Sequence, residues 1–206
     1  MPSPVGHILA GTAVYLTGTR IESRTKIVLA ITLFGSILPD FDFLPGIWIG
    51  NLRAFHHGVS HSLAFAVLFG MLTFFFARWR RKDLALCIGI LAASAYASHV
   101  LLDLVSVNEG TRGVPILWPL SDRSFGLNLQ LLGYFHYGKI DRGIWSIVRW
   151  DNLSAISLEL MVFGTPTLFL LWRERRSAQK LRRPPEKIVY PVARDDVARE
   201  NQGGLK

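Results

Sequence analysis

The stretch LALCIGILAASAYASHVLLDLV, residues 84–105, decides the fold of this chain. It contains only two strongly polar side chains, those of His99 and Asp103. At a rise of about 1.5 Å per residue, a helix of this length reaches roughly 33 Å and crosses the hydrocarbon core of a bilayer. The stretch therefore predicts a membrane-spanning helix that carries two ionisable groups.

The composition of the whole chain extends this prediction. The 206 residues are 50% hydrophobic and 18% charged, with a mean hydropathy of +0.30, whereas soluble domains carry about 25% charged residues. The net charge of +8 comes from basic residues in short segments beside apolar runs, so we expect no nucleic-acid partner. The single cysteine, Cys87, lies within the apolar stretch and excludes a disulfide framework.

Four further apolar segments accompany residues 84–105, namely 5–18, 26–38, 62–77 and 153–172. The last two approach the length of a membrane span, although Glu159 and Pro166 interrupt 153–172. Segments 5–18 and 26–38 are shorter than the roughly 17 residues that usually span, so we expect them to tilt against neighbours or to form a shallow pair. The fold class predicted is all-α, a polytopic membrane helical bundle with about four to five membrane helices.

Basic residues orient this bundle, because Lys and Arg accumulate in short cytoplasmic loops. They gather between the first and second segments, between the third and fourth, and after the fifth: Arg20, Arg24, Lys26, Arg78, Arg80, Arg81, Lys82 and seven more up to Lys187. By contrast, the loop 39–61 has Arg53 as its single basic residue, and the long loop 106–152 has only five basic residues among 47. Five spans with the N-terminus outside and the C-terminus cytoplasmic satisfy this pattern.

The chain is expected to divide near residue 173. We predict a membrane-embedded domain over 1–173 and a basic cytoplasmic tail of low order over 174–206, because the tail has no apolar period. The N-terminus lacks the basic region of a cleaved signal peptide, so the first apolar segment is expected to be retained.

His99 and Asp103 are four residues apart, which places both side chains on one face of the helix. Burial of such groups in an apolar medium is costly unless they are paired or bound to metal. The alternative is a His–Asp hydrogen bond that only fastens two helices. His56, His57 and His61 precede the segment 62–77, and we expect only one of His56 and His57 to be a ligand; solvated or capping histidines are the alternative.

Asp40 and Asp42 alternate with Phe41 and Phe43. In an extended turn both carboxylates would point one way and the aromatic rings the other, which favours a cation between the carboxylates. The alternative is an N-capping Asp40 and a solvated Asp42. His7, which follows Gly6, is by itself uninformative.

Imidazole nitrogens and carboxylate oxygens together form the ligand set of zinc, manganese or iron sites. With one of His56 and His57 counted, the candidates number seven, more than the three or four ligands of one catalytic zinc. Either two metals share the site, or some residues act as acid–base and supporting groups. The absence of cysteine ligands argues against a structural zinc, and no Gly-x-Ser-x-Gly or Ser-x-x-Lys motif supports a serine nucleophile. We favour metal-activated water attacking an ester, phosphoester or amide.

Five motifs in this order resemble the YdjM-like family of bacterial inner-membrane proteins, predicted metal-dependent hydrolases: Gly6-His7, LPDFD at 38–42, HHGVSHSL at 56–63, SHVLLD at 98–103 and GVPILWP at 113–119. The chain departs from the family at Phe43, where a histidine is common, and at His57, where arginine is common. The resemblance implies a functional role for the polar residues at the matching positions. We assign Asp40, His56, His61, His99 and Asp103 to a divalent metal, zinc or manganese, and acid–base or supporting roles to Asp42 and His7.

We therefore expect an inner-membrane, metal-dependent hydrolase with its site at the outer membrane face. A phosphoester or lipid-linked substrate is expected because the site lies near the bilayer interface. One alternative is a transporter for metal ions or protons, which needs polar groups continuing toward the cytoplasmic half, where Glu159 is the candidate. Another is a non-enzymatic membrane organiser.

Overall fold

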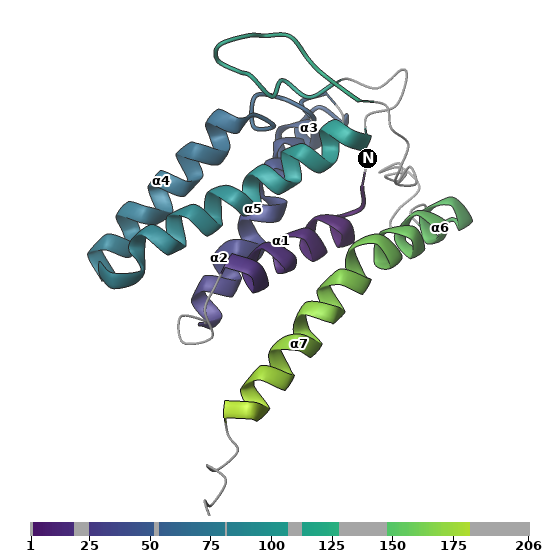
Figure 1. Ribbon diagram of the computed structural model, residues 1–206. Helices are drawn as coiled ribbons and strands as arrows, with labels where there is room; N and C mark the ends of the chain where they lie inside the picture. The colour runs from purple at the N-terminus through teal and green to yellow at the C-terminus, as the bar shows by residue number, and fades with distance from the viewer. Residues whose placement is uncertain are drawn as a thin grey trace, which may run out of the picture. The chain divides into compact units, whose positions relative to one another are not determined.

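The computed structural model describes residues 2–18, 25–51, 54–80, 82–106, 113–127 and 148–181. In these residues the regular elements are helices, as predicted: α1 (Pro4–Gly18), α2 (Lys26–Ile37), the 3₁₀ helix η2 (Leu38–Phe43), α3 (Leu44–Trp48), α4 (Leu63–Arg80), η3 (Lys82–Leu84), α5 (Ala85–Ser106), α6 (Trp150–Glu159), the π-helix η6 (Leu160–Gly164) and α7 (Thr165–Leu181) (Figure 1). Large parts of the predicted outer loop, 107–112 and 128–147, and the tail from 182 lie outside the described residues.

The chain divides into two compact units, Met1–Arg173 and Glu174–Lys206. Helix α7 continues from the first unit to Leu181, so the beginning of the predicted tail is helical. The functions assigned to the two parts stay predictions.

Four helical stretches of the described chain are long and apolar enough to cross a membrane: Lys26–Trp48, Leu63–Arg80, Ala85–Ser106 and Trp150–Arg176. This number agrees with the predicted four to five. The second predicted segment, 26–38, matches α2 to within one residue, and the helical path continues beyond it through η2 and α3 to Trp48. Pro39 lies in the first turn of η2, where its missing N–H needs no acceptor, so it does not break the path.

Helix α1, which corresponds to the short predicted segment 5–18, has 15 residues and a length of about 22 Å, less than the roughly 30 Å of a hydrocarbon core. It packs against α2 and α5. A Cβ atom at Gly11 would lie 2.5 Å from Ser36 Oγ, and one at Gly18 would collide with Leu91. The two glycines therefore let α1 lie directly on its neighbours.

Helices α4 and α5 form the most extensive helix pair, joined by the short η3 (Figure 1). A Cβ at Gly70 would lie 2.8 Å from the carbonyl oxygen of Gly89, and one at Gly89 would lie 2.9 Å from that of Gly70. Such close backbone approach is how helices associate in lipid, where burial of apolar surface gives no net drive. The connection carries Arg78, Arg80 and Lys82, so this end of the hairpin is the basic end of the bundle.

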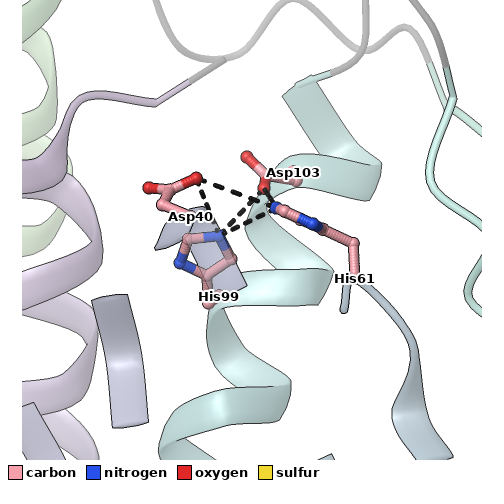
Figure 2. A group of neighbouring side chains, drawn as sticks. All are labelled: Asp40, His61, His99 and Asp103. Carbon is pink, nitrogen blue, oxygen red and sulfur yellow. Dashed lines mark hydrogen bonds and ion pairs between the residues drawn. The ribbon is translucent and has the colours of Figure 1, made fainter. Parts of the chain in front are cut away.

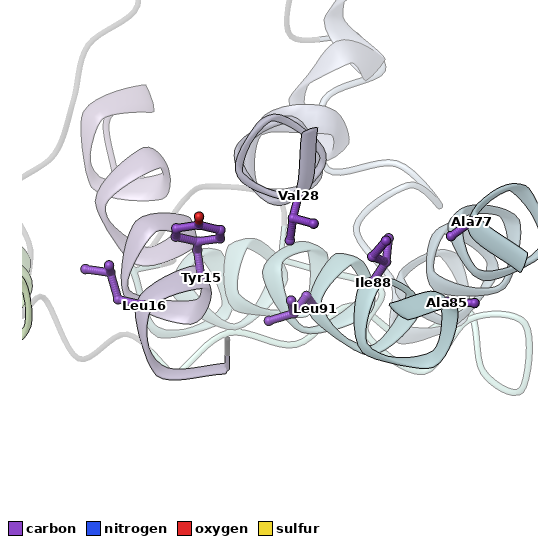
Figure 3. Packing of buried hydrophobic residues seen from close by; sticks show 7 residues of the cluster. All are labelled: Tyr15, Leu16, Val28, Ala77, Ala85, Ile88 and Leu91. Atoms are coloured by element: carbon purple, nitrogen blue, oxygen red, sulfur yellow. The ribbon is translucent and has the colours of Figure 1, made fainter. Parts of the chain in front are cut away.

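Two apolar clusters hold the helices together. One lies toward the basic end and joins α1, α2, α4 and α5 through Tyr15, Leu16, Val28, Ala77, Ala85, Ile88 and Leu91 (Figure 3). The other contains Ala66, Tyr96, Val100 and Val114, which brings residues of the segment after α5 onto α4 and α5. The polar residues singled out in the sequence gather at the end of the helices opposite the basic end.

The last span changes its helical form where Glu159 and Pro166 interrupt the apolar segment. The π-helix η6 lies between these two residues, and its wider turn accommodates the proline ring, which would clash with the carbonyl of residue 162 in a regular α-helix. Glu159 is fully buried and accepts hydrogen bonds from the backbone N–H of Ser3, at 2.6 Å, and from the Ser3 hydroxyl. Glu159 thus lies beside Ser3, just before α1, at the end of α1 away from the basic end, whereas it had been predicted to lie in the half of the bundle near the basic residues.

Candidate metal centre

The candidate residues come from four parts of the fold. His7 lies in the first turns of α1, Asp40 and Asp42 lie in η2, the three histidines at 56, 57 and 61 lie between α3 and α4, and His99 and Asp103 lie in the last turns of α5. The predicted extended conformation around Asp40 and Asp42 was wrong. In a 3₁₀ helix, with three residues per turn, side chains two positions apart point in directions about 120° from each other. The two carboxylates therefore approach His56 and His61 from different sides, Asp40 at their Nε2 atoms and Asp42 at their Nδ1 atoms.

Asp40, His61, His99 and Asp103 form a group that could hold a metal ion, which we call the four-residue cluster (Figure 2). One ligand atom from each lies within 4.8 Å of the others. The Nε2 of His99 is 3.1 Å from Asp103 Oδ2 and 3.5 Å from Asp40 Oδ1. The Nε2 of His61 is 3.3 Å and 3.7 Å from the same two oxygens, and the two Nε2 atoms are 3.3 Å apart.

The opposite ring nitrogens explain why both Nε2 atoms face this cluster. The Nδ1 of His99 is 2.8 Å from the backbone carbonyl of Ser36, which can only accept, so Nδ1 carries the proton. The Nδ1 of His61 is 3.1 Å from Asp42 Oδ2. Metal-binding histidines are held in this way, with one nitrogen donating to an oxygen and the other free to coordinate.

Three carboxylate oxygens of the cluster have no hydrogen-bond partner among the described residues. In the described part of the chain, Asp40 Oδ1 and both oxygens of Asp103 are buried without a hydrogen-bond partner. Asp103 has no exposed surface. Leaving such acceptors unsatisfied costs free energy, and a bound cation would remove that cost.

Asp42 differs from the cluster because its contacts are ordinary hydrogen bonds. Its Oδ1 lies 2.9 Å from His56 Nδ1, and its Oδ2 accepts from the Ser60 hydroxyl at 3.1 Å and from the Gly58 N–H at 3.3 Å. Asp42, His56 and His61 also meet the geometric requirement for a metal group. The distances nevertheless favour Asp42 as a carboxylate that orients two imidazoles. His56, predicted as a metal ligand, lies in this second group with its Nε2 4.0 Å from Asp40 Oδ1.

His7 and His57 approach Asp103 from other sides. The His7 ring stacks on His99 with centroids 3.7 Å apart, and its Nε2 lies 3.6 Å from Asp103 Oδ1. His57 is buried, with its Nε2 3.8 Å from Asp103 Oδ2, and its φ of 60° belongs to the left-handed region. The sequence prediction did not find this position of His57, because it depends on a backbone conformation that histidine adopts only occasionally.

The carboxylates determine the protonation of His61 in the absence of a cation. Burial disfavours the charged imidazole, but Asp103, Asp40 and Asp42 outweigh this effect and raise the pKa of His61 well above 6.5. Without a metal, the site therefore attracts a proton to this ring.

Together these features define a polytopic helical membrane protein with a buried His/Asp group that could bind a metal at one end of its bundle. The family model described as YdjM inner membrane protein matches residues 1–176, so the chain belongs to the YdjM inner membrane protein family. The chain is 36% identical over 137 residues to the inner membrane protein YbcI of Escherichia coli (strain K12), covering 64% of this chain and 76% of YbcI. No solved structure matches. The predicted family and inner-membrane environment are confirmed.

Proposed function

We propose that this protein is a metal-dependent hydrolase that binds zinc at the four-residue cluster. The observation that carries the proposal is the set of five separations among the ligand atoms, which run from 3.1 to 3.7 Å. A tetrahedral zinc with bonds of about 2.0–2.1 Å holds its ligand atoms about 3.3–3.4 Å apart. Five of the six separations are thus close to those around a tetrahedral zinc, and manganese is the second choice because its octahedral sites favour oxygen ligands.

The four ligands are not equivalent. His61, His99 and Asp103 are the tightest group, whereas Asp40 lies farther from both imidazoles and is 14% exposed. Catalytic zinc sites use three protein ligands and keep the fourth position for water or substrate. Asp40 thus occupies the side at which water would enter, either as an exchangeable ligand or as a group that binds that water.

A bound zinc would polarise the substrate and make water more acidic, and the surrounding residues would handle protons and positions. Asp42, which is 10% exposed, is the better candidate for accepting a proton from water. His7 has no exposed surface, so it can act only through His99 and Asp103, which it contacts. In the reaction, water adds to a phosphorus or acyl carbon, and the bond to the alcohol oxygen breaks as that oxygen takes a proton.

The basic end of the bundle supports an extracytoplasmic position for the site. Lys26 begins α2, and Arg78, Arg80 and Lys82 lie around the α4–α5 connection, at the end away from the cluster. Because basic residues favour the cytoplasmic side, the cluster would face outward, with the N-terminus outside and the C-terminus cytoplasmic.

Metal analysis tests this proposal directly. Plasma mass spectrometry on detergent-purified protein is expected to find zinc or manganese at a stoichiometric level, and a His61→Ala/His99→Ala double variant should lose it. The matched control is Asp151→Asn, which changes an exposed carboxylate paired with Arg149. Circular dichroism would establish that each variant is folded. Metal-bound protein would then be screened with ester and phosphoester substrates. Wild-type protein that cannot be loaded with metal would overturn the hydrolase proposal.

A further inference from the structure

Glu159 is a buried carboxylate of the last span that lies outside the four-residue cluster and outside the five sequence motifs. It is the last residue of α6 and directly precedes the π-helix η6. A carboxylate buried in an apolar medium is costly unless hydrogen bonds stabilise it, and π-helical turns are rare and frequent at functional sites. Both features indicate that Glu159 has a role beyond filling space.

The Glu159 carboxylate binds both polar groups of Ser3. Its Oε1 accepts from the Ser3 N–H at 2.6 Å, and its Oε2 accepts from the Ser3 hydroxyl. The Ser3 oxygen in turn accepts from the N–H of Val5 at 3.2 Å and from that of Gly6 at 3.4 Å, so Ser3 caps the N-terminus of α1. Because the single hydroxyl proton of Ser3 goes to Glu159, its lone pairs are left for these two N–H groups. Glu159 therefore fixes the capping residue of α1.

The same contact explains the glycine at position 6. A Cβ atom at Gly6 would lie 3.0 Å from both Cδ and Oε2 of Glu159, so a larger residue would press against the carboxylate. Helix α6 and η6 both pack against α1. The adjacent residues Gly6 and His7 thus have different partners, since Gly6 meets the last span and His7 meets the candidate centre.

His7 lies one helical turn from Ser3. Its backbone N–H donates to the Ser3 carbonyl at 3.3 Å, which places both residues in the same turn. In the described residues neither ring nitrogen of His7 has a hydrogen-bond partner, yet its ring stacks on His99 with centroids 3.7 Å apart. The backbone of α1 therefore determines where the His7 ring lies against His99.

From these contacts we infer that Glu159 is a positioning residue of the metal centre, which holds the first turn of α1 so that His7 keeps the His99 ring oriented toward the cation. Groups that orient metal-binding histidines typically contribute 10–100-fold to affinity. The inference rests on the proposed metal centre and adds to it a contribution from the last span, whose described residues supply no ligand to the four-residue cluster.

A double-mutant cycle tests whether Glu159 acts through His7. Zinc is titrated by competition with a fluorescent chelator in detergent-purified wild type, Glu159→Ala, His7→Ala and the double variant. We expect each single variant to bind zinc about tenfold more weakly and the double variant to lose no more than His7→Ala alone. A product of the two losses, about 100-fold, would show that the residues act independently and would overturn the inference.

A second comparison separates positioning from general stability. Gly89→Ala places a Cβ against Phe74 in the α4–α5 pair and should lower the melting temperature without weakening zinc binding. Glu159→Gln keeps an acceptor for the Ser3 N–H and should retain more zinc affinity than Glu159→Ala; it replaces the latter in the cycle if that variant does not fold. Equal zinc affinity in Glu159→Ala and wild type, or an equal loss in Gly89→Ala, would leave Glu159 a purely structural role.

The last experiment needs no metal. Diethyl pyrocarbonate modifies accessible imidazoles, and mass spectrometry locates the modified residues. His7 has no exposed surface, so it should react slowly in metal-free wild type and several-fold faster in Glu159→Ala. Ser157→Ala, which removes an exposed hydroxyl of α6, should match the wild type. Unchanged His7 reactivity in Glu159→Ala would overturn the inference, whereas failure of wild-type protein to bind metal would instead overturn the hydrolase proposal.

Discussion

Replacing Asp42 by asparagine separates the residues that would bind the metal from those that orient its ligands. Asp42 accepts from His56 Nδ1, the Ser60 hydroxyl and the Gly58 N–H, and its Oδ2 lies 3.1 Å from His61 Nδ1. An asparagine brings an NH₂ group into this ring of donors, so His61 loses its fixed orientation. Carboxylates that orient metal-binding histidines typically contribute 10–100-fold to affinity, which corresponds to about 1.4–2.7 kcal/mol.

The assay is a competition titration of zinc between the protein in detergent and a fluorescent chelator. Asp42→Asn should bind zinc at full stoichiometry but 10–100-fold more weakly, and Asp151→Asn should match the wild type. Asp103→Asn removes a predicted ligand and should abolish stoichiometric binding. If Asp42→Asn lost zinc as completely as Asp103→Asn, Asp42 would be a ligand; unchanged affinity would refute the orienting role.

Three further predictions concern protons, packing and the anchored N-terminus. The carboxylates raise the pKa of His61 well above 6.5, so zinc must displace a proton from this ring. The apparent zinc affinity should therefore keep rising as the pH increases above 6.5. A plateau near pH 6.5 in the competition titration would contradict this. Gly89→Ala places a Cβ 2.8 Å from Phe74 Cβ and should cost about 1–3 kcal/mol, seen as a lower melting temperature. Gly164→Ala should cost less, because its Cβ would meet Leu160 at 3.9 Å, an ordinary van der Waals distance. Glu159→Ala leaves the Ser3 N–H without its acceptor and should destabilise by about 1–3 kcal/mol, with Glu159→Gln milder; equal melting temperatures would show that the contact carries no stability.

The sequence predicted the parts of the fold that depend on side-chain spacing. His99 and Asp103 meet because residues four apart share a helix face, and His61 joins them because its segment begins α4 beside α5. An extended turn was predicted around Asp40 and Asp42, although Pro39 occupies the first turn of a 3₁₀ helix, a position that tolerates proline. The carbonyl of Ser36, which fixes His99, could not be predicted, since every residue has a carbonyl and only tertiary packing selects this one.

The rival functions make different demands on the buried polar groups. A conduit for ions or protons needs such groups along the membrane, yet among the described residues the fully buried ionisable side chains of His7, His61, His99, Asp103 and Glu159 lie at or beside the candidate centre. Toward the basic end, the helices meet through an apolar cluster. This distribution disfavours the conduit.

A network that only fastens helices should satisfy its own donors and acceptors, as the contacts of Asp42 do at 2.9–3.3 Å. The neighbouring four-residue cluster does not satisfy its polar groups in this way. It leaves three carboxylate oxygens without hydrogen bonds and brings two imidazole nitrogens to 3.3 Å, at the spacing of ligands around one cation. His61 belongs both to the hydrogen-bond network of Asp42 and to the four-residue cluster, so the fold satisfies polar groups in one place and leaves them unsatisfied in the other. The unsatisfied carboxylate oxygens of the cluster therefore favour a bound cation over a role in fastening helices.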